Sequence, residues 1–270
     1  MTTSATSAAH NPADPMISVI GLYKSFGEKE VLRGVDLEIG RGESLMLVGG
    51  SGAGKSVFIK HLIGLLQPDE GHVVVDGVDL THASPEAVLE LRKRFGMTFQ
   101  EGALFDSMTV GDNIAFPIRR HTEKTEMEVA TRVRECLELV RLPGIEDKMP
   151  AELSGGQRQR VTIARALVNK PAIVWADEPT GDLDSKTSQD IVDLMRRLNK
   201  ENGQTFVIVT HSEEIGRQTD RIIWMRDGLI EEKQEALLPA VFALNGNGTA
   251  VPAPALSLPA TLPVYVEATS

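Results

Sequence analysis

Short runs of consecutive apolar residues alternate along the chain with segments in which apolar residues recur every three or four positions. Strands that are covered on both faces of a sheet are apolar at successive positions, so we predict strands at 44–48, 172–176 and 205–210. We predict helices at 55–66 and 158–170, each of which ends just before a proline. This alternation predicts a parallel α/β sheet.

Two further regions depart from that alternation. Residues 17–40 have a hairpin-like alternation of apolar and polar positions, which predicts a small antiparallel sheet. The stretch from about 101 to 170 has a mostly helical pattern and interrupts the succession of strands and helices. We therefore predict one domain, 16–238, with a helical subdomain inside it.

The two ends of the chain differ from the middle in composition. Residues 1–15 are small, polar and proline-containing, which predicts disorder. The prolines of residues 239–270 exclude a continuous helix or a central strand, so we expect an extended tail. Its segment PVYVEA (263–268) either adds an edge strand to a partner or belongs to a plain tail.

Composition and charge narrow the class of protein. Hydrophobic residues make up 41% of the 270 residues, which is enough for a core. The formal net charge of −10 argues against broad binding to nucleic acid. The first residues lack the features of a secretory signal, and no apolar run approaches the roughly 20 residues that cross a bilayer. We therefore expect a cytoplasmic protein that reaches a membrane only through other subunits.

The single cysteine, Cys136, excludes an intrachain disulfide and a cysteine metal cluster. It shares helical spacing with Val129, Val133, Leu137 and Val140. Because free cysteine commonly fills such apolar positions, we interpret Cys136 as a buried core thiol.

A glycine-rich loop connects the first predicted buried strand to the first predicted helix. Its sequence GGSGAGKS matches the Walker A pattern in the strand–loop–helix context that the pattern requires. Backbone N–H groups of such a loop surround phosphates, while Lys55 neutralises the outer phosphates and Ser56 can bind Mg²⁺. The predicted phosphate-binding residues are Gly49, Gly50, Ser51, Gly52, Ala53, Gly54, Lys55 and Ser56.

The strand predicted at 172–176 leads into Asp177 and Glu178. In an open α/β sheet, ligands bind at the carboxyl ends of the strands. We predict that Asp177 holds Mg²⁺, directly or through water, and that Glu178 is the general base for the attacking water. The alternative, a surface acidic pair, does not account for the apolar strand that precedes it.

Two other polar residues are further candidates for this site. His211 leaves the strand at 205–210 on the expected ligand side, where it would bond to the γ-phosphate or the attacking water. Judged from spacing alone, this role and a structural role for His211 are equally favoured. Gln100 would reach Mg²⁺ or water, although a glutamine considered alone is more often a loop amide.

The sequence LSGGQRQR (153–160) predicts a second helix start that binds anions. A serine caps the helix, two glycines allow close approach, and N–H groups are exposed at the positive end of the helix dipole. The residues concerned are Ser154, Gly155, Gly156 and Gln157. The reason for two phosphate sites in one chain does not follow from these residues alone.

Along the chain the motifs follow the order KSFG, Walker A loop, Gln100, LSGGQ, the strand before Glu178, GDLD and His211. In this order they resemble the motifs of the ATP-binding cassette (ABC) ATPases, from about residue 17 to 235. The resemblance implies the ABC ATPase fold. That fold has a P-loop NTPase (RecA-like) parallel-sheet core, a small antiparallel β subdomain and an inserted α-helical subdomain. It also implies ATP and Mg²⁺ as ligands and makes the chain an ATPase.

The same resemblance implies roles for single residues. Phe26 of KSFG would stack on adenine, and Gln100 would be the Q-loop residue near Mg²⁺. Asp184 of GDLD would be the D-loop aspartate, and His211 the catalytic switch histidine. Residues 154–157 would be the signature motif.

The resemblance also implies a reason for the second helix start. In ABC ATPases two ATP-binding domains dimerise head to tail, and each ATP is held by the Walker loop of one domain and the signature of the other. A chain with one Walker loop and one signature is then expected to form a two-fold symmetric homodimer with two composite sites. Hydrolysis would remove the γ-phosphate and so loosen the contact between the two subunits of the dimer.

The segment 99–122 resembles the ATPase subunit of the MCE-associated, Mla-type lipid transporters, because GALF, MTV, DN, P and R-HT recur there in the same register. This resemblance implies phospholipid or other lipid as the substrate. It implies integral-membrane permease subunits and an MCE-type lipid-binding protein as partners. The acidic charge balance predicts no nucleic acid as a partner. The chain would then lie on the inner face of the cell membrane, attached through the permease.

That segment is also expected to contact the permease. It supplies apolar side chains that either form a surface for a permease helix or belong to the ordinary core of the helical subdomain. The residues of this expected surface are Ala103, Leu104, Phe105, Phe116 and Pro117.

Other systems stay open as alternatives. One is the ATPase of an importer for a polar solute such as an amino acid. Another is an ABC ATPase of the lipoprotein-release or cell-division type, to which PTGDLD is more similar. ABC proteins that act on DNA or ribosomes usually have two cassettes, a coiled-coil insertion or zinc-binding cysteines, whereas this chain has one cassette and one cysteine.

Overall fold

The chain divides into two compact units, Met1–Lys233 and Gln234–Ser270. Within its described residues, the second unit contains an antiparallel pair, β11 (Phe242–Leu244) and β12 (Ala250–Pro252). Residues 1–14 and the segment 263–268 lie outside the described part, so the expectations for them stay predictions. The computed structural model describes residues 15–98, 103–181, 183–210, 216, 218–231, 242–244 and 250–252.

The first sheet of the larger unit is antiparallel and has the strand order β2-β1-β4-β5. Its first two strands confirm the antiparallel sheet predicted at 17–40. The other two were not assigned from the sequence, and they pair with β1 and with each other. The strands are β1 (Ile17–Phe26), β2 (Lys29–Ile39), β4 (Glu70–Val75) and β5 (Val78–Asp79).

The second sheet contains the predicted buried strands, with bounds that differ from prediction by no more than one residue at either end. Its order is β10-β9-β3-β8-β7-β6, and all neighbours are parallel except β10 and β9. The strands are β3 (Ser44–Val48), β6 (Phe95–Thr98), β7 (Ile173–Asp177), β8 (Thr205–Val209), β9 (Arg221–Arg226) and β10 (Leu229–Glu231). The predicted parallel α/β sheet is confirmed.

The parallel sheet separates two hydrophobic cores. In β7, Ile173 and Trp175 belong to a core shared with β1, β2, β4 and α1 (Lys55–Leu62). Val174 and Ala176 belong to a core shared with the helices on the other face. Because side chains alternate along a strand, a strand that is buried on both faces has an uninterrupted apolar run.

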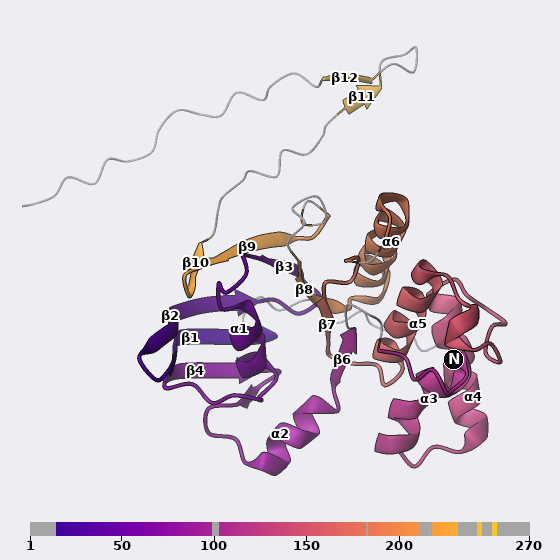
Figure 1. The fold of residues 1–270 in the computed structure, drawn as a ribbon, viewed down its shortest axis with the longest axis horizontal. Coiled ribbons are helices and arrows are strands. Elements are labelled where there is room, and N and C mark those ends of the chain that lie inside the picture. Colours follow the sequence, from indigo (N-terminus) through magenta and orange to yellow (C-terminus); the bar gives the residue numbers. More distant parts are fainter. Residues whose placement is uncertain are drawn as a thin grey trace, which may run out of the picture. The chain divides into compact units, whose positions relative to one another are not determined.

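The helices α3 (Val110–His121), α4 (Glu126–Leu139) and α5 (Gly155–Leu167) form a group on the side of the molecule away from β1, β2 and β4 (Figure 1). This group confirms the mostly helical pattern predicted for 101–170. Cys136 is fully buried in it, as predicted, and burial raises the pKa of its thiol to about 11. Two further helices in the described part of the chain are α2 (Pro85–Arg92) and α6 (Ser185–Asn202), and Pro150–Glu152 forms a 3₁₀ turn.

Helix α1 is shorter than the predicted helix at 55–66. Gly64 has a φ of +68°, and the N–H of Leu65 turns back to the carbonyl of Lys60 at 2.7 Å. A left-handed glycine with such a return bond is a common way for a helix to end. The proline at 68 was therefore not the residue that ends this helix.

Helix α5 is shifted relative to the predicted helix at 158–170. It begins at Gly155, because Ser154 caps it and the two glycines form its first turn. It ends at Leu167, before Lys170 adopts a left-handed φ of +52°. In the part of the chain that the structure describes, we find no helix that combines the length and the apolar character of a membrane span.

Candidate nucleotide-binding site

The order of the strands brings the glycine-rich loop and the acidic pair to one end of the sheet. The strand that leads into the loop, β3, and the strand that ends at Asp177, β7, are the two neighbours of β8. Leu47 and Asp177 are both in register with Val209, the last residue of β8. The N–H of Glu178 donates to the carbonyl of Val209 at 2.8 Å and so continues this register past the strand end.

The loop between β3 and α1 requires glycine at two positions. A Cβ atom at Gly49 would lie 2.4 Å from the carbonyl oxygen of Met225, and Gly54 has a φ of +105°. Gly54 is the N-cap of α1 and, lacking a side chain, leaves the first N–H groups of this helix without a side-chain cap. These N–H groups at the positive end of the helix dipole fit a phosphate.

The side chain of Lys55 folds over the loop. Its Nζ donates to the carbonyl oxygens of Gly49 at 2.5 Å and of Gly50 at 3.0 Å. A Cβ atom at Gly50 would have open space around it. The ammonium group therefore lies against the loop backbone, beside the volume where phosphates are predicted.

Asp177 interacts electrostatically with this lysine. Partial burial raises the pKa of Asp177, the negative charge of Glu178 raises it further, and the positive charge of Lys55 lowers it. Glu178 itself has a left-handed φ of +44°, which is uncommon for a residue other than glycine, asparagine or aspartate. Such backbone strain is often found where a side chain must be aimed at a ligand.

A cavity of about 200 Å³ lies between α1 and the strands β6, β7 and β8. Ser56, Asp177 and Thr98 are among the residues that line it, and the buried hydroxyl of Thr98 has no hydrogen-bond partner among the described residues. Oxygen atoms are the ligands that Mg²⁺ prefers, and it usually keeps several waters. The donor set therefore fits Mg²⁺ at Ser56 and Asp177.

Phe26 is the last residue of β1 and is 49% exposed. It pairs with Lys29 at the start of β2, and the same strand brings the carbonyl of Val31 close to Gly54. The Lys24 ammonium lies 5.7 Å from the centre of the Phe26 ring. An exposed ring on the same pair of strands as Val31 suits the predicted stacking on a base.

The signature motif forms the first turn of α5 and its cap. The Ser154 hydroxyl accepts the Gln157 N–H at 3.3 Å, and the Gln157 side chain accepts the Ser154 N–H at 3.0 Å. This reciprocal pair is a capping box, which the spacing S-x-x-Q makes predictable. Sequence analysis identified the serine cap but not this role of Gln157.

The signature glycines also contact the start of α6. A Cβ atom at Gly156 would lie 2.4 Å from Cγ2 of Thr187, and one at Gly155 would lie 3.2 Å from Cδ2 of Leu183. Asp184, the predicted D-loop aspartate, is the N-cap of α6 and accepts the Thr187 hydroxyl at 2.6 Å. The signature turn and the D-loop are therefore packed as one unit.

We expect Gly156→Ala to lower the free energy of unfolding by about 1–2 kcal/mol, because overpacking against a fixed neighbour costs roughly that much. Thr187→Ser removes the methyl group that the new Cβ would meet and keeps the hydroxyl bonded to Asp184. In that background Gly156→Ala should be neutral or stabilising, since alanine is favoured in helices by about 1 kcal/mol over glycine. Urea denaturation of the wild type, the two single variants and the double variant measures the coupling free energy between the two substitutions. Equal effects in both backgrounds would contradict the contact.

Two predicted site residues, Gln100 and His211, lie outside the described residues, and their roles stay predictions. Residues close to them along the chain are described. Thr98 ends β6, and the N–H of Thr210 donates to the carbonyl of Leu47 at 3.3 Å.

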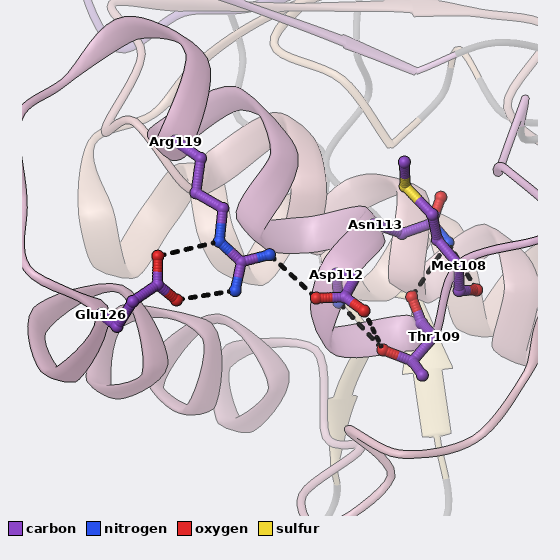
Figure 2. A network of polar contacts seen from close by, with 6 residues as sticks. All are labelled: Met108, Thr109, Asp112, Asn113, Arg119 and Glu126. Carbon is purple, nitrogen blue, oxygen red and sulfur yellow. Dashed lines mark hydrogen bonds and ion pairs between the residues drawn. The ribbon is translucent and has the colours of Figure 1, made fainter.

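The loop before α3 is held by a buried asparagine that sequence analysis did not single out. Asn113 accepts the N–H of Phe105 at 2.8 Å and donates to the carbonyls of Phe105, Met108 and Thr109. Figure 2 shows Asn113 beside Met108 and Thr109 at the start of the helix. A polar residue within the apolar pattern of VGDNIAF was the available signal.

The structure divides the five residues of the expected permease-contacting surface. Leu104 packs against the core of the helical group. Phe105 and Phe116 are each 42% exposed, and their ring centres are 5.1 Å apart. Arg119 joins Asp112 in α3 to Glu126 at the start of α4 and fixes the helix that carries Phe116 (Figure 2).

A strand–loop–helix cradle beside an acidic strand end defines a nucleotide-binding protein of the P-loop class. Within this class the chain belongs to the ABC transporter family, because the sequence model of that family matches residues 32–181. Its fold is that of the ABC ATPases, and the chain is an ATP-binding subunit of that family. A solved structure described as the dimeric structure of MJ0796, a bacterial ABC transporter cassette, is 36% identical with a TM-score of 0.71. The match covers 80% of this chain and 97% of that one.

Two curated relatives have different transport functions in their names. The probable ribonucleotide transport ATP-binding protein mkl of Mycobacterium leprae is 46% identical over 76% of this chain and 59% of its own length. The methionine import ATP-binding protein MetN of Cupriavidus metallidurans is 42% identical over 80% of this chain and 64% of its own. The chain thus spans about three fifths of the length of these relatives.

Proposed function

We propose that this chain binds and hydrolyses ATP to drive a membrane permease. The observation that carries the proposal is the register of three neighbouring strand ends, which brings Lys55, Asp177 and Glu178 to one edge of the sheet. A cradle alone would suit any phosphate ligand. A carboxylate pair beside the cradle adds the groups that hydrolysis needs.

In this proposal the N–H groups of the loop and Lys55 hold the β- and γ-phosphates of ATP, and Phe26 stacks on adenine. Glu178 accepts the proton of the water that attacks the γ-phosphate. Mg²⁺, bound through Ser56 and Asp177, would neutralise charge on the phosphates. Gln100 and His211 are proposed to orient Mg²⁺ or water and the γ-phosphate.

We further propose that two copies of the chain close around two ATP molecules. The capping box leaves the first-turn N–H groups of Gly155 and Gly156 without side-chain acceptors from Ser154 and Gln157. A second anion can bind there if it comes from a partner chain. The solved cassette of similar fold is described as dimeric. Residues 154–157, with Asp184 beside them, would thus complete the partner's site.

Membrane permease subunits are the proposed partner of the Phe105–Phe116 pair. Both rings are exposed, while Asn113 and Arg119 fix their positions, so the pair forms a small rigid apolar surface. Aromatic residues that stay exposed on a fixed support are typical of a contact surface. The chain would then work at the inner face of the cell membrane.

The proposed substrate is phospholipid or another lipid, with an MCE-type lipid-binding protein in the complex. Support comes from the resemblance of segment 99–122 to Mla-type ATPases. A polar-solute importer is the second candidate, because a relative is named for methionine import. Another relative is named for ribonucleotide transport, and a ribonucleotide is also a polar solute. The alternative of a lipoprotein-release ATPase is supported only by the sequence PTGDLD.

We expect the wild-type chain, purified from membranes of the native host, to retain a multi-spanning permease and an MCE-domain protein. Phe105→Ser with Phe116→Ser should lose the permease and keep ATP binding. Leu89→Ser, which changes a 53% exposed leucine on α2, is the matched control and should keep both. Mass spectrometry of the retained proteins identifies the partners. A retained solute-binding protein would contradict the lipid proposal.

A further inference from the structure

A cluster of two histidines and an aspartate lies on the antiparallel sheet, and none of its members belongs to the nucleotide-binding site. His72 is on β4, Asp79 ends β5, and His82 follows in the turn before α2. One potential ligand atom from each residue lies within 4.8 Å of those of the other two. All three side chains reach solvent, so an ion can enter freely.

Both imidazoles face the same carboxylate oxygen. His82 Nδ1 is 2.9 Å and His72 Nδ1 is 3.9 Å from Oδ2 of Asp79. The two rings are tilted by 34°, with centres 5.6 Å apart. Ligands around a tetrahedral Zn²⁺ are roughly 3.3–3.5 Å apart, given Zn–N and Zn–O distances of about 2.0–2.2 Å. Small side-chain rotations of exposed histidines are enough to reach that spacing.

The backbone holds this cluster in place. The other oxygen of Asp79 accepts the Thr81 N–H at 2.9 Å, and the Thr81 hydroxyl accepts the N–H of Val73 at 3.1 Å. Leu80 donates to the carbonyl of Val73 at 2.8 Å. The carboxylate is therefore oriented by neighbours that do not bind the ion, as in many protein metal sites.

We propose that His72, Asp79 and His82 form a binding site for Zn²⁺ or a similar transition-metal ion. Imidazole nitrogen is a good ligand for Zn²⁺, Ni²⁺ and Cu²⁺, whereas Mg²⁺ prefers oxygen, so the site is selective against the ion of the nucleotide site. The three ligands leave one position for water. A bound ion would join β4, β5 and the turn before α2, and would stabilise this part of the folded chain.

The test uses the full chain without an affinity tag, titrated with ZnCl₂ by calorimetry in the absence of nucleotide and Mg²⁺. We expect one Zn²⁺ per chain and a rise in the midpoint of thermal unfolding. His72→Gln and His82→Gln should each weaken binding at least tenfold. His121→Gln, which changes an exposed histidine at the end of α3, should bind as the wild type does.

Circular dichroism and ATP binding without Zn²⁺ show whether the histidine variants are folded. Co²⁺ absorption offers a second measurement, because its visible bands report nitrogen and oxygen ligands directly and should disappear in His82→Gln. Unchanged Zn²⁺ affinity in both variants would place the ion elsewhere, such as at Asp177 and Glu178, and overturn the proposal. Failure of the folded wild-type chain to bind Zn²⁺ at 1000-fold excess would also overturn it.

Discussion

Glu178→Gln is expected to bind ATP as tightly as the wild type and to hydrolyse it about 10²–10⁴-fold more slowly. The amide has nearly the shape of the carboxylate, so the left-handed backbone at residue 178 and its N–H bond to Val209 are retained. It cannot accept a proton from the attacking water. The phosphate cradle, which lies on β3 and α1, does not depend on this side chain.

Two measurements separate the loss of catalysis from a loss of structure. Phosphate release gives turnover, and gel filtration with ATP shows whether the slowed variant accumulates as a dimer. Glu201→Gln is the matched control, because Glu201 is 61% exposed on α6 and its contact with Arg197 is long, at 3.4 Å. It should turn over ATP normally. Normal turnover in Glu178→Gln would show that another group is the base.

The sheet and the phosphate loop were predictable because their determinants are local. Burial on both faces leaves an uninterrupted apolar run in β3, β7 and β8, and Gly54 is required by a backbone angle. The order of the strands is not local. That β8 lies between β3 and β7, and so brings Lys55 near Asp177, became visible only in the fold.

One contact that sequence analysis missed joins residues that are distant along the chain. Gly156 is needed because Thr187 lies against it, and nothing within α5 reveals that neighbour. The end of α1 was placed at 66, since the proline at 68 was visible and the left-handed conformation of Gly64 was not. Asn113 differs, because its hydrogen-bond partners lie within eight residues along the chain. An amide four residues after the N-cap Thr109, within an apolar pattern, could have been recognised.

The second large effect is expected when two inactive variants are mixed. Lys55→Ala removes the ammonium group that lies against the phosphate loop, and Ser154→Arg places a bulky side chain at the start of α5. Each homodimer would then have a lesion in both composite sites and bind ATP about 10- to 150-fold more weakly, since a lost charge-assisted contact is worth roughly 1.5–3 kcal/mol.

A mixed dimer has a different distribution of lesions. One site combines the intact Walker loop of the Ser154→Arg chain with the intact signature of the Lys55→Ala chain, while the other site receives both lesions. If the chains pair at random, about half of the dimers are mixed and about a quarter of all sites are intact. Nucleotide retained after gel filtration, in chains that also contain Glu178→Gln, counts those sites without requiring turnover.

Ser154→Ala distinguishes the effect of bulk from that of a lost helix cap, which costs about 1 kcal/mol of stability. If that variant is folded, the Arg variant reports on the contact with the partner's nucleotide. A site formed within a single chain predicts no recovery on mixing, because each chain would keep its own lesion. Recovery of about a quarter of the sites requires that the helix start at Ser154 serves the ATP held by the other chain's Walker loop.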